Sequence, residues 1–161
     1  MTGHIDPLCY LEPSQASGRA FVARKHQGAL VMLNLLRFRD TADYSAHLEL
    51  APAAPITGAS AFQRYIEHTL PYLHASGGDV SFLGAGGEFL IGPPGERWDL
   101  VMLVRQHSIE SFLAFATHQD YLAGMGHRVA ALEDSRLLPL SELPLPSVPS
   151  VPSVPRCDID A

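Results

Sequence analysis

The chain has little charge and almost no cysteine. Charged residues make up 17% of its 161 residues, against about 25% in an average soluble protein. Its 11 Lys and Arg residues are scattered and the formal net charge is −6, which argues against the basic surface of a nucleic-acid-binding protein. The two cysteines, Cys9 and Cys157, lie near opposite ends of the chain, which excludes a disulfide framework and a cysteine metal site.

Long apolar runs and familiar cofactor motifs are missing as well. No segment approaches the roughly 18 consecutive apolar residues of a membrane span, and residues 1–6 lack the basic and apolar regions of a signal peptide. We therefore expect a cytoplasmic protein with no membrane partner. The sequence has no H-E-x-x-H, no G-K-S/T and no G-x-S-x-G motif, so we expect no metal site, no cofactor and no serine nucleophile.

Hydrophobic residues nevertheless make up 47% of the chain, enough for the core of one domain. We place that domain at residues 29–143, after an N-terminal extension at 1–28. Residues 40–57 form an insertion with an expected short helix at 42–50. The segment 144–161 contains Ser-Val-Pro three times in succession, and proline at every third residue favours an extended polyproline II tail, to which we assign no function.

Two segments have the nearly unbroken apolar sequence of strands that are buried on both faces, residues 29–38 and 98–104. Between them, apolar residues at three- and four-residue spacings predict an amphipathic helix over 59–75. We expect glycine at 77 to end this helix. Pro71 should kink or split it, because proline removes one backbone donor and crowds the preceding turn.

Shorter elements complete the predicted order. Residues 80–83 and 88–91 are strand-like pieces separated by glycines, which predicts a hairpin-like excursion. Ser108 is placed to cap a helix, a second helical stretch covers 119–132, and 136–140 forms a last strand. The order predicts an α+β protein with the ferredoxin-like βαββαβ topology and an antiparallel sheet.

That topology predicts a dimer. Its helices cover one face of the sheet and leave the other face open, yet the first strand is apolar on both faces, with Leu30, Met32 and Leu36 on one and Val31, Leu33 and Leu35 on the other. Soluble monomers rarely tolerate an exposed apolar sheet. We therefore predict a homodimer in which two open faces meet in an isologous contact.

Several segments carry a family resemblance. They are residues 31–39, 62–65, 77–78, 98–101, 111–113 and 127–137. In order and spacing they resemble the domain-of-unknown-function family 1330 of the dimeric α/β-barrel superfamily. The resemblance implies a ferredoxin-like protomer whose sheet faces its partner's sheet in a barrel-like dimer. It implies no particular activity, because superfamily members include monooxygenases, isomerases and ligand binders.

Three residues are candidates for catalysis. His68 and Tyr72 are four residues apart on the expected helix, where an imidazole and a phenol would be neighbours. Arg128 has the forked donors that bind a carboxylate or an enolate oxygen. Each has a structural alternative: helical aromatic residues usually belong to a core, a histidine on the polar flank of a helix is usually solvated, and Arg128 could pair with Asp134 and Glu133.

Four further residues are candidates for ligand binding: Asn34, Tyr65, Trp98 and Arg37. Asn34 and Arg37 are the polar positions in the first apolar strand, where a polar group must find a partner or line a cavity. The structural alternatives are a hydrogen bond within the sheet or dimer contact for Asn34, a salt bridge with Asp99 or Asp134 for Arg37, and a core position for Trp98.

Together these observations predict a homodimer that binds a small, mainly apolar organic molecule, either as a binder or as a cofactor-independent enzyme of monooxygenase or isomerase type. The alternative is a non-catalytic dimeric binding or interaction protein. An enzyme needs a cavity with a titratable group such as His68 or Arg128 pointing into it. An assembly module should instead pack the space between its sheet and helices solid.

Overall fold

The computed structural model describes residues 9–146, which form a four-stranded antiparallel sheet with the strand order β2-β3-β1-β4. The strands are β1 (Leu30–Phe38), β2 (Asp79–Glu88), β3 (Arg97–Gln106) and β4 (Leu132–Ser141). The helices are α1 (Gln15–Ala23), the short 3-10 helix η1 (Leu48–Leu50), α2 (Gly58–Ala75), α3 (Ile109–Ala116), α4 (Gln119–Leu122) and α5 (Met125–Ala131). The predicted ferredoxin-like α+β fold is confirmed.

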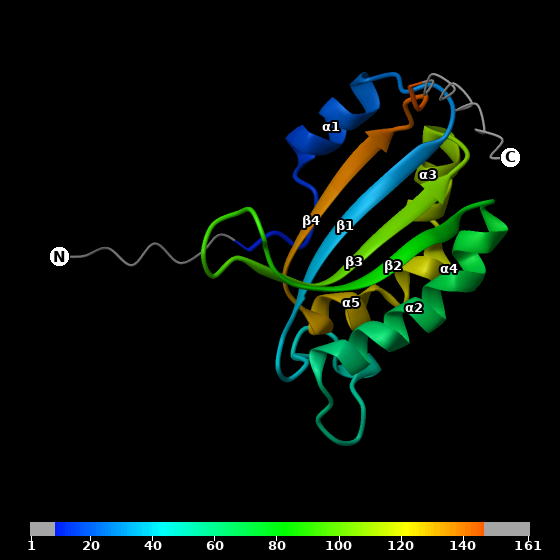
Figure 1. Ribbon diagram of the computed structural model, residues 1–161. Helices are drawn as coiled ribbons and strands as arrows, with labels where there is room; N and C mark the ends of the chain where they lie inside the picture. Colours follow the sequence, from blue (N-terminus) through cyan, green and yellow to red (C-terminus); the bar gives the residue numbers. More distant parts are fainter. Residues whose placement is uncertain (1–8, 147–161) are drawn as a thin grey trace, which may run out of the picture.

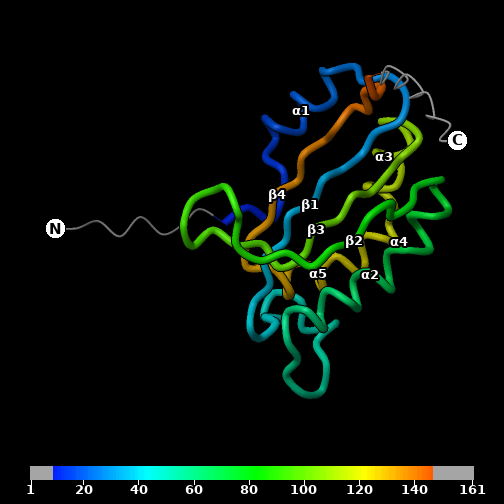
Figure 2. Tube along the Cα trace, in the orientation of Figure 1, coloured from blue at the N-terminus to red at the C-terminus, as the bar shows by residue number. Residues whose placement is uncertain are grey.

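The helices that follow β1 and β3 gather on one side of the sheet. Figures 1 and 2 show α2, α4 and α5 together there. None of the helices in residues 9–146 has the length and hydropathy of a membrane-spanning segment. The Ser-Val-Pro repeat and Cys157 fall outside the described residues.

Alternation along β1 separates the two faces of the sheet as predicted. Leu30, Met32 and Leu36 are buried, and Leu36 belongs to the core that the helices cover. Val31 and Leu33, on the opposite face, are only half-buried. The open face that the sequence predicts is therefore present within residues 9–146.

Helix α2 ends at the expected glycine but is not split. The Thr57 side chain accepts a hydrogen bond from the Ser60 amide at its start, and Gly77 has a φ of +82° just beyond its end. The helix runs unbroken through Pro71. Pro71 and Glu67 are both exposed, so water can satisfy the Glu67 carbonyl that loses its amide donor.

The prediction of a hairpin-like excursion around the glycines at 84–87 is wrong. Instead of two short pieces, one continuous strand β2 passes through residues 84–87, and Phe89 lies beyond its end. A Cβ at Gly86 would collide with the Trp98 carbonyl of β3. Glycine at this position therefore serves close strand pairing rather than a turn.

Three other boundaries differ from the predictions. The expected helix at 42–50 is reduced to η1, and the stretch 119–132 is divided into α4 and α5. Strand β4 starts at Leu132 rather than at 136. Helix α1 was not predicted; the Ser14 side chain caps it, and the Phe21 ring meets the Phe112 ring of α3 edge-on at 5.7 Å.

Candidate functional site

The structure distributes the seven predicted site residues over several parts of the molecule. Tyr65, His68 and Tyr72 lie on α2, where α4 packs against it. Arg37 and Trp98 meet near one end of the sheet, whereas Asn34 and Arg128 make separate contacts.

His68 joins α2 to α4 through the backbone. Its Nε2 lies 2.8 Å from the carbonyl oxygen of Asp120 and 3.2 Å from that of Tyr121. Carbonyl oxygens only accept hydrogen bonds, so Nε2 carries the proton. A Cβ at Gly124 would overlap the His68 ring, so glycine permits this close approach. The imidazole is therefore a bridge between two helices.

The two tyrosines of the predicted group have different surroundings. The Tyr65 hydroxyl is 3.0 Å from the Tyr121 hydroxyl in a buried contact, and burial raises the pKa of Tyr121. Tyr72 is half-buried, with its ring centroid 5.3 Å from the rings of both His68 and His118. The predicted proximity of His68 and Tyr72 is confirmed, while their catalytic role stays a prediction.

Arg128 holds the segment that precedes α1. Its Nη1 donates to the Leu11 carbonyl at 2.6 Å and its Nη2 donates to the Ser135 hydroxyl at 3.3 Å. The Ser135 hydroxyl in turn donates to the Tyr10 carbonyl at 2.5 Å. Arg128 was expected to bind a ligand carboxylate through its forked donors. In this structure the same donors bind the Leu11 carbonyl and the Ser135 hydroxyl.

Arg37 and Trp98 belong to a group of charged and aromatic side chains. Arg37 forms ion pairs with Glu133 at 3.1 Å and with Asp134 at 3.8 Å, as the structural alternative predicted for Asp134. The Arg37 and Arg136 guanidinium carbons lie 5.8 and 5.1 Å from the Trp98 ring centroid. The buried ring therefore contacts two cations, an arrangement that stabilises the end of the sheet.

Asp134 is the buried anion of this group. Burial alone would raise the pKa of its carboxyl group, but hydrogen bonds from the Tyr10 amide, the Arg136 guanidinium and the Ser135 amide outweigh burial and lower the pKa. The carboxylate therefore ties the N-terminal segment to β4.

Asn34 faces the helix-covered side of the sheet with Met32 and Leu36. It is half-buried, and its Nδ2 donates to the Met32 carbonyl at 3.2 Å. This contact is the hydrogen bond within the sheet that was considered as its structural alternative.

The pair formed by Tyr44 and His127 was missing from the predicted site. The Tyr44 hydroxyl, from the 40–57 insertion, lies 2.8 Å from Nδ1 of His127 on α5. Burial raises the pKa of Tyr44. Burial, with the nearby charges of Arg64 and His68, lowers the pKa of His127. Both groups are therefore neutral near pH 7, an arrangement in which the tyrosine donates to Nδ1.

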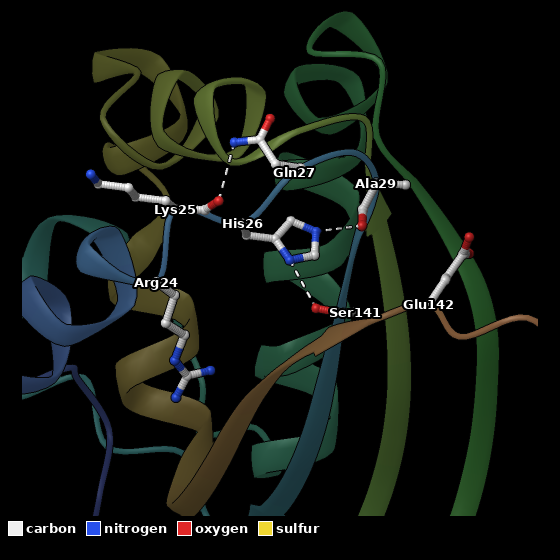
Figure 3. Close-up of a pocket in the computed structure, with 7 residues that line it drawn as sticks. All are labelled: Arg24, Lys25, His26, Gln27, Ala29, Ser141 and Glu142. Carbon is white, nitrogen blue, oxygen red and sulfur yellow. Dashed lines mark hydrogen bonds between the residues drawn. The ribbon is translucent and has the colours of Figure 1, made fainter.

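Two surface pockets lie away from the predicted site residues. One, of about 270 Å³, lies in the insertion, and Tyr44 lines it. The other, of about 470 Å³, surrounds His26, whose Nε2 donates to the Ala29 carbonyl at 2.7 Å and whose Nδ1 lies 2.9 Å from the Ser141 hydroxyl. Figure 3 shows the side chains of Arg24 and Lys25 pointing in different directions around it. They do not converge on one ligand position.

No group of three metal-ligating side chains occurs among residues 9–146. No protein-family model matches the sequence, and no curated protein matches it.

Solved structures do match. RPA0582 from Rhodopseudomonas palustris, described as a protein of unknown function, is 32% identical, with a TM-score of 0.75 over 86% of this chain and 100% of its own. The chain belongs to the RPA0582 family. A methylated form of RPA0582, also 32% identical, gives a TM-score of 0.76 over 84% of this chain and 96% of its own.

A dimeric protein of unknown function with a ferredoxin-like fold from Bacteroides fragilis is 14% identical, with a TM-score of 0.45 over 72% of this chain and 98% of its own. Because RPA0582 is a protein of unknown function, the function of this chain has to be argued from its own surfaces.

Proposed function

We propose that this chain is a homodimeric binding protein in which a second copy covers the open face of the sheet. We also propose that its family falls within domain-of-unknown-function family 1330 of the dimeric α/β-barrel superfamily. One observation carries the dimer: an apolar row crosses the open face from edge to edge.

The row follows from the register of the strands. Leu33 of β1 is paired with Leu103 of β3 on one side and with Leu138 of β4 on the other, and Leu103 is paired with Phe82 of β2. Phe82 and Leu138 are 53% and 50% exposed. Burying one such side chain contributes about 1.5–3 kcal/mol, so covering the row is strongly favourable.

The neighbouring rows give this surface a polar border. Leu35 pairs with Val101 and with Arg136, and Val31 pairs with Leu140 and with Arg105. An apolar centre with charged residues at its margin is the usual composition of a protein interface. A two-fold axis through the row would bring identical rows together.

Binding, rather than catalysis, is favoured by the present partners of the predicted catalytic groups. Nε2 of His68 and Nη1 of Arg128 both donate to backbone carbonyls. A general acid or an oxyanion-binding group needs a donor that is available to the substrate. The structural roles of these two groups therefore support a protein that binds without chemistry.

The test is the mass of the protein in solution. We expect sedimentation velocity at about 50 µM to give twice the 17.4 kDa of the chain. Leu33→Glu, which places a charge in the centre of the row, should give monomers with an unchanged circular dichroism spectrum.

Leu48→Glu is the matched control, because Leu48 is 75% exposed in η1 and lies outside the sheet. It should remain dimeric. A monomeric wild type, or a dimer that survives Leu33→Glu with its stability intact, would rule out the proposed contact.

A further inference from the structure

The segment that precedes α1 is held by a set of side chains rather than by a strand. Its residues 10–13 form no backbone–backbone hydrogen bond with the rest of the described chain. Polar side chains from α5 and β4 bind its main chain and its aromatic ring instead; they are Arg128, Asp134, Ser135 and Arg136. We call these four side chains the Asp134 site and residues 10–13 the N-terminal segment.

The Asp134 site matches the hydrogen-bonding groups of a peptide main chain. The Asp134 carboxylate accepts a hydrogen bond from the Tyr10 amide at 2.8 Å. The Ser135 hydroxyl donates to the Tyr10 carbonyl at 2.5 Å, and Nη1 of Arg128 donates to the next carbonyl, that of Leu11, at 2.6 Å. Peptides of many sequences offer an amide and two successive carbonyls, so this part of the recognition is not tied to one sequence.

Side-chain contacts add selectivity to the Asp134 site. The Arg136 guanidinium carbon lies 4.8 Å from the centroid of the Tyr10 ring and 5.1 Å from that of the Trp98 ring. A guanidinium attracts the face of an aromatic ring. Leu11 packs against the hydrophobic core. The site therefore accommodates an aromatic side chain that is followed by an aliphatic one.

The N-terminal segment is attached to the domain less firmly than the strands are. Helix α1, which follows it, has no buried residue, and the contact of α1 with α3 through Phe21 lies near the far end of the helix. Tyr10 is 50% exposed. Segments with few buried apolar contacts open locally at a lower free energy than the whole domain unfolds. Release would take the Tyr10 amide from the buried Asp134 carboxylate, so the open site favours a ligand that supplies the same groups.

We propose that the Asp134 site binds a peptide segment with an aromatic residue followed by an aliphatic one, and that the N-terminal segment is its exchangeable occupant. Covalent attachment gives this occupant an effective concentration on the order of millimolar, so it inhibits the binding of other peptides until it is released. The site lies outside the apolar row of the proposed dimer, with Arg136 at the border of that row. Peptide binding therefore does not depend on whether the dimer forms.

Fluorescence polarisation with a labelled, acetylated peptide tests the proposal. The probe has the sequence Ser-Tyr-Leu-Glu-Pro, which is residues 9–13 with serine in place of the cysteine. The full chain with both Tyr10→Ala and Leu11→Ala loses the ring contact and the apolar contact of the occupant. We expect this double variant to bind the probe at least about tenfold more tightly than the wild type, because its site is open for a larger fraction of the time. Absence of binding to the double variant would overturn the proposal, and so would equal binding to both proteins.

Arg128→Lys in the same double variant shows where the probe binds. Lysine keeps the positive charge but loses the fork that reaches the Leu11 carbonyl and the Ser135 hydroxyl, so probe binding should weaken at least about tenfold. Arg105→Lys is the matched control, because Arg105 is exposed at the other end of β3 and pairs with Glu142 at 3.0 Å. It should bind like its parent. Unchanged binding in Arg128→Lys would place the probe elsewhere and overturn the proposal.

A changed probe tests the site without a further change in the protein. The peptide Ser-Ala-Leu-Glu-Pro lacks the ring that faces Arg136, so the double variant should bind it more weakly than the original probe. Equal affinity for the two peptides would show that the site does not select an aromatic residue.

Hydrogen exchange followed by NMR on the wild-type chain tests release of the occupant directly. The Tyr10 amide donates to Asp134, whereas Leu33 lies in β1, which is paired on both sides. Relative to their intrinsic rates, the Tyr10 amide should exchange at least about 100-fold faster than the Leu33 amide, because local opening is enough to expose it. Equal protection would mean that the N-terminal segment leaves only when the domain unfolds, and the occupant would not be exchangeable.

Discussion

At the scale of single residues, Asp134 is the side chain whose loss should matter most. Its carboxylate is 5% exposed, accepts hydrogen bonds from the Tyr10 and Ser135 amides, and pairs with Arg136 at 2.7 Å. Asp134→Ala should lower the free energy of unfolding by about 2–3 kcal/mol, because the Tyr10 and Ser135 amides and the Arg136 guanidinium lose their shared acceptor. Urea denaturation measures the change.

Glu133 offers the control for Asp134. It is 48% exposed and bonds to the same Arg37, so Glu133→Ala should cost less than about 1 kcal/mol. Equal losses in the two variants would show that the buried hydrogen bonds of Asp134 contribute little.

His127 makes stability depend on pH in a predictable direction. Its folded-state pKa lies below the ordinary value of 6.5, because burial first, and then Arg64 and His68, disfavour its cation. The neutral form therefore supports folding above about pH 6.5, and this contribution is lost as the pH falls through 6.5 toward the folded-state pKa.

His127→Asn removes the titrating ring and keeps an acceptor for the Tyr44 hydroxyl. We expect the urea midpoint of the wild type to fall more between pH 7.5 and pH 5 than that of the variant. His26→Asn is a control at another half-buried histidine. Parallel pH profiles for wild type and His127→Asn would contradict the assignment.

At the scale of elements, Gly58 is the point where α2 meets the ends of β1 and α5. A Cβ there would lie 2.6 Å from the Ala131 carbonyl oxygen and 2.8 Å from the Arg39 amide nitrogen. Backbone atoms yield less than side chains, so Gly58→Ala should cost more than about 2 kcal/mol. The melting temperature should fall accordingly.

Gly18→Ala is the opposite case and the control. Gly18 lies within α1, and its Cβ would meet nothing within 4 Å. The change should stabilise the protein by about 0.5–1 kcal/mol, because alanine favours the helix. If both variants melt alike, steric contact at Gly58 is not what requires glycine there.

Local patterns predicted the regular elements and failed where a distant contact decides the structure. The apolar runs identified β1 and β3, and three- and four-residue spacing identified α2. The role of Gly86 depends on the Trp98 carbonyl across the sheet. No pattern within the sequence of β2 carries that information, so the sequence predicted two short strands where the structure has one.

The candidate site shows the same limit. Helical spacing brought His68 close to Tyr72, as predicted. Helical spacing could not show that Nε2 of His68 donates its hydrogen bond to the Asp120 carbonyl. Tyr44 and His127 are 83 positions apart in the chain, and their contact depends on the path of an irregular insertion that no periodicity describes.

At the scale of the whole molecule, the proposed dimer should couple folding to association. Burying the apolar row only in the dimer stabilises the native state by mass action, so the melting temperature should rise with protein concentration. Between about 1 and 100 µM the wild type should shift by several degrees. Leu33→Glu should have the same melting temperature at every protein concentration, and this temperature should lie below that of the wild type, because its charged row cannot be buried. Leu48→Glu should retain the wild-type slope. A wild-type melting temperature that is constant over this range would mean that the open face contributes nothing through a second copy, whatever the mass at one concentration.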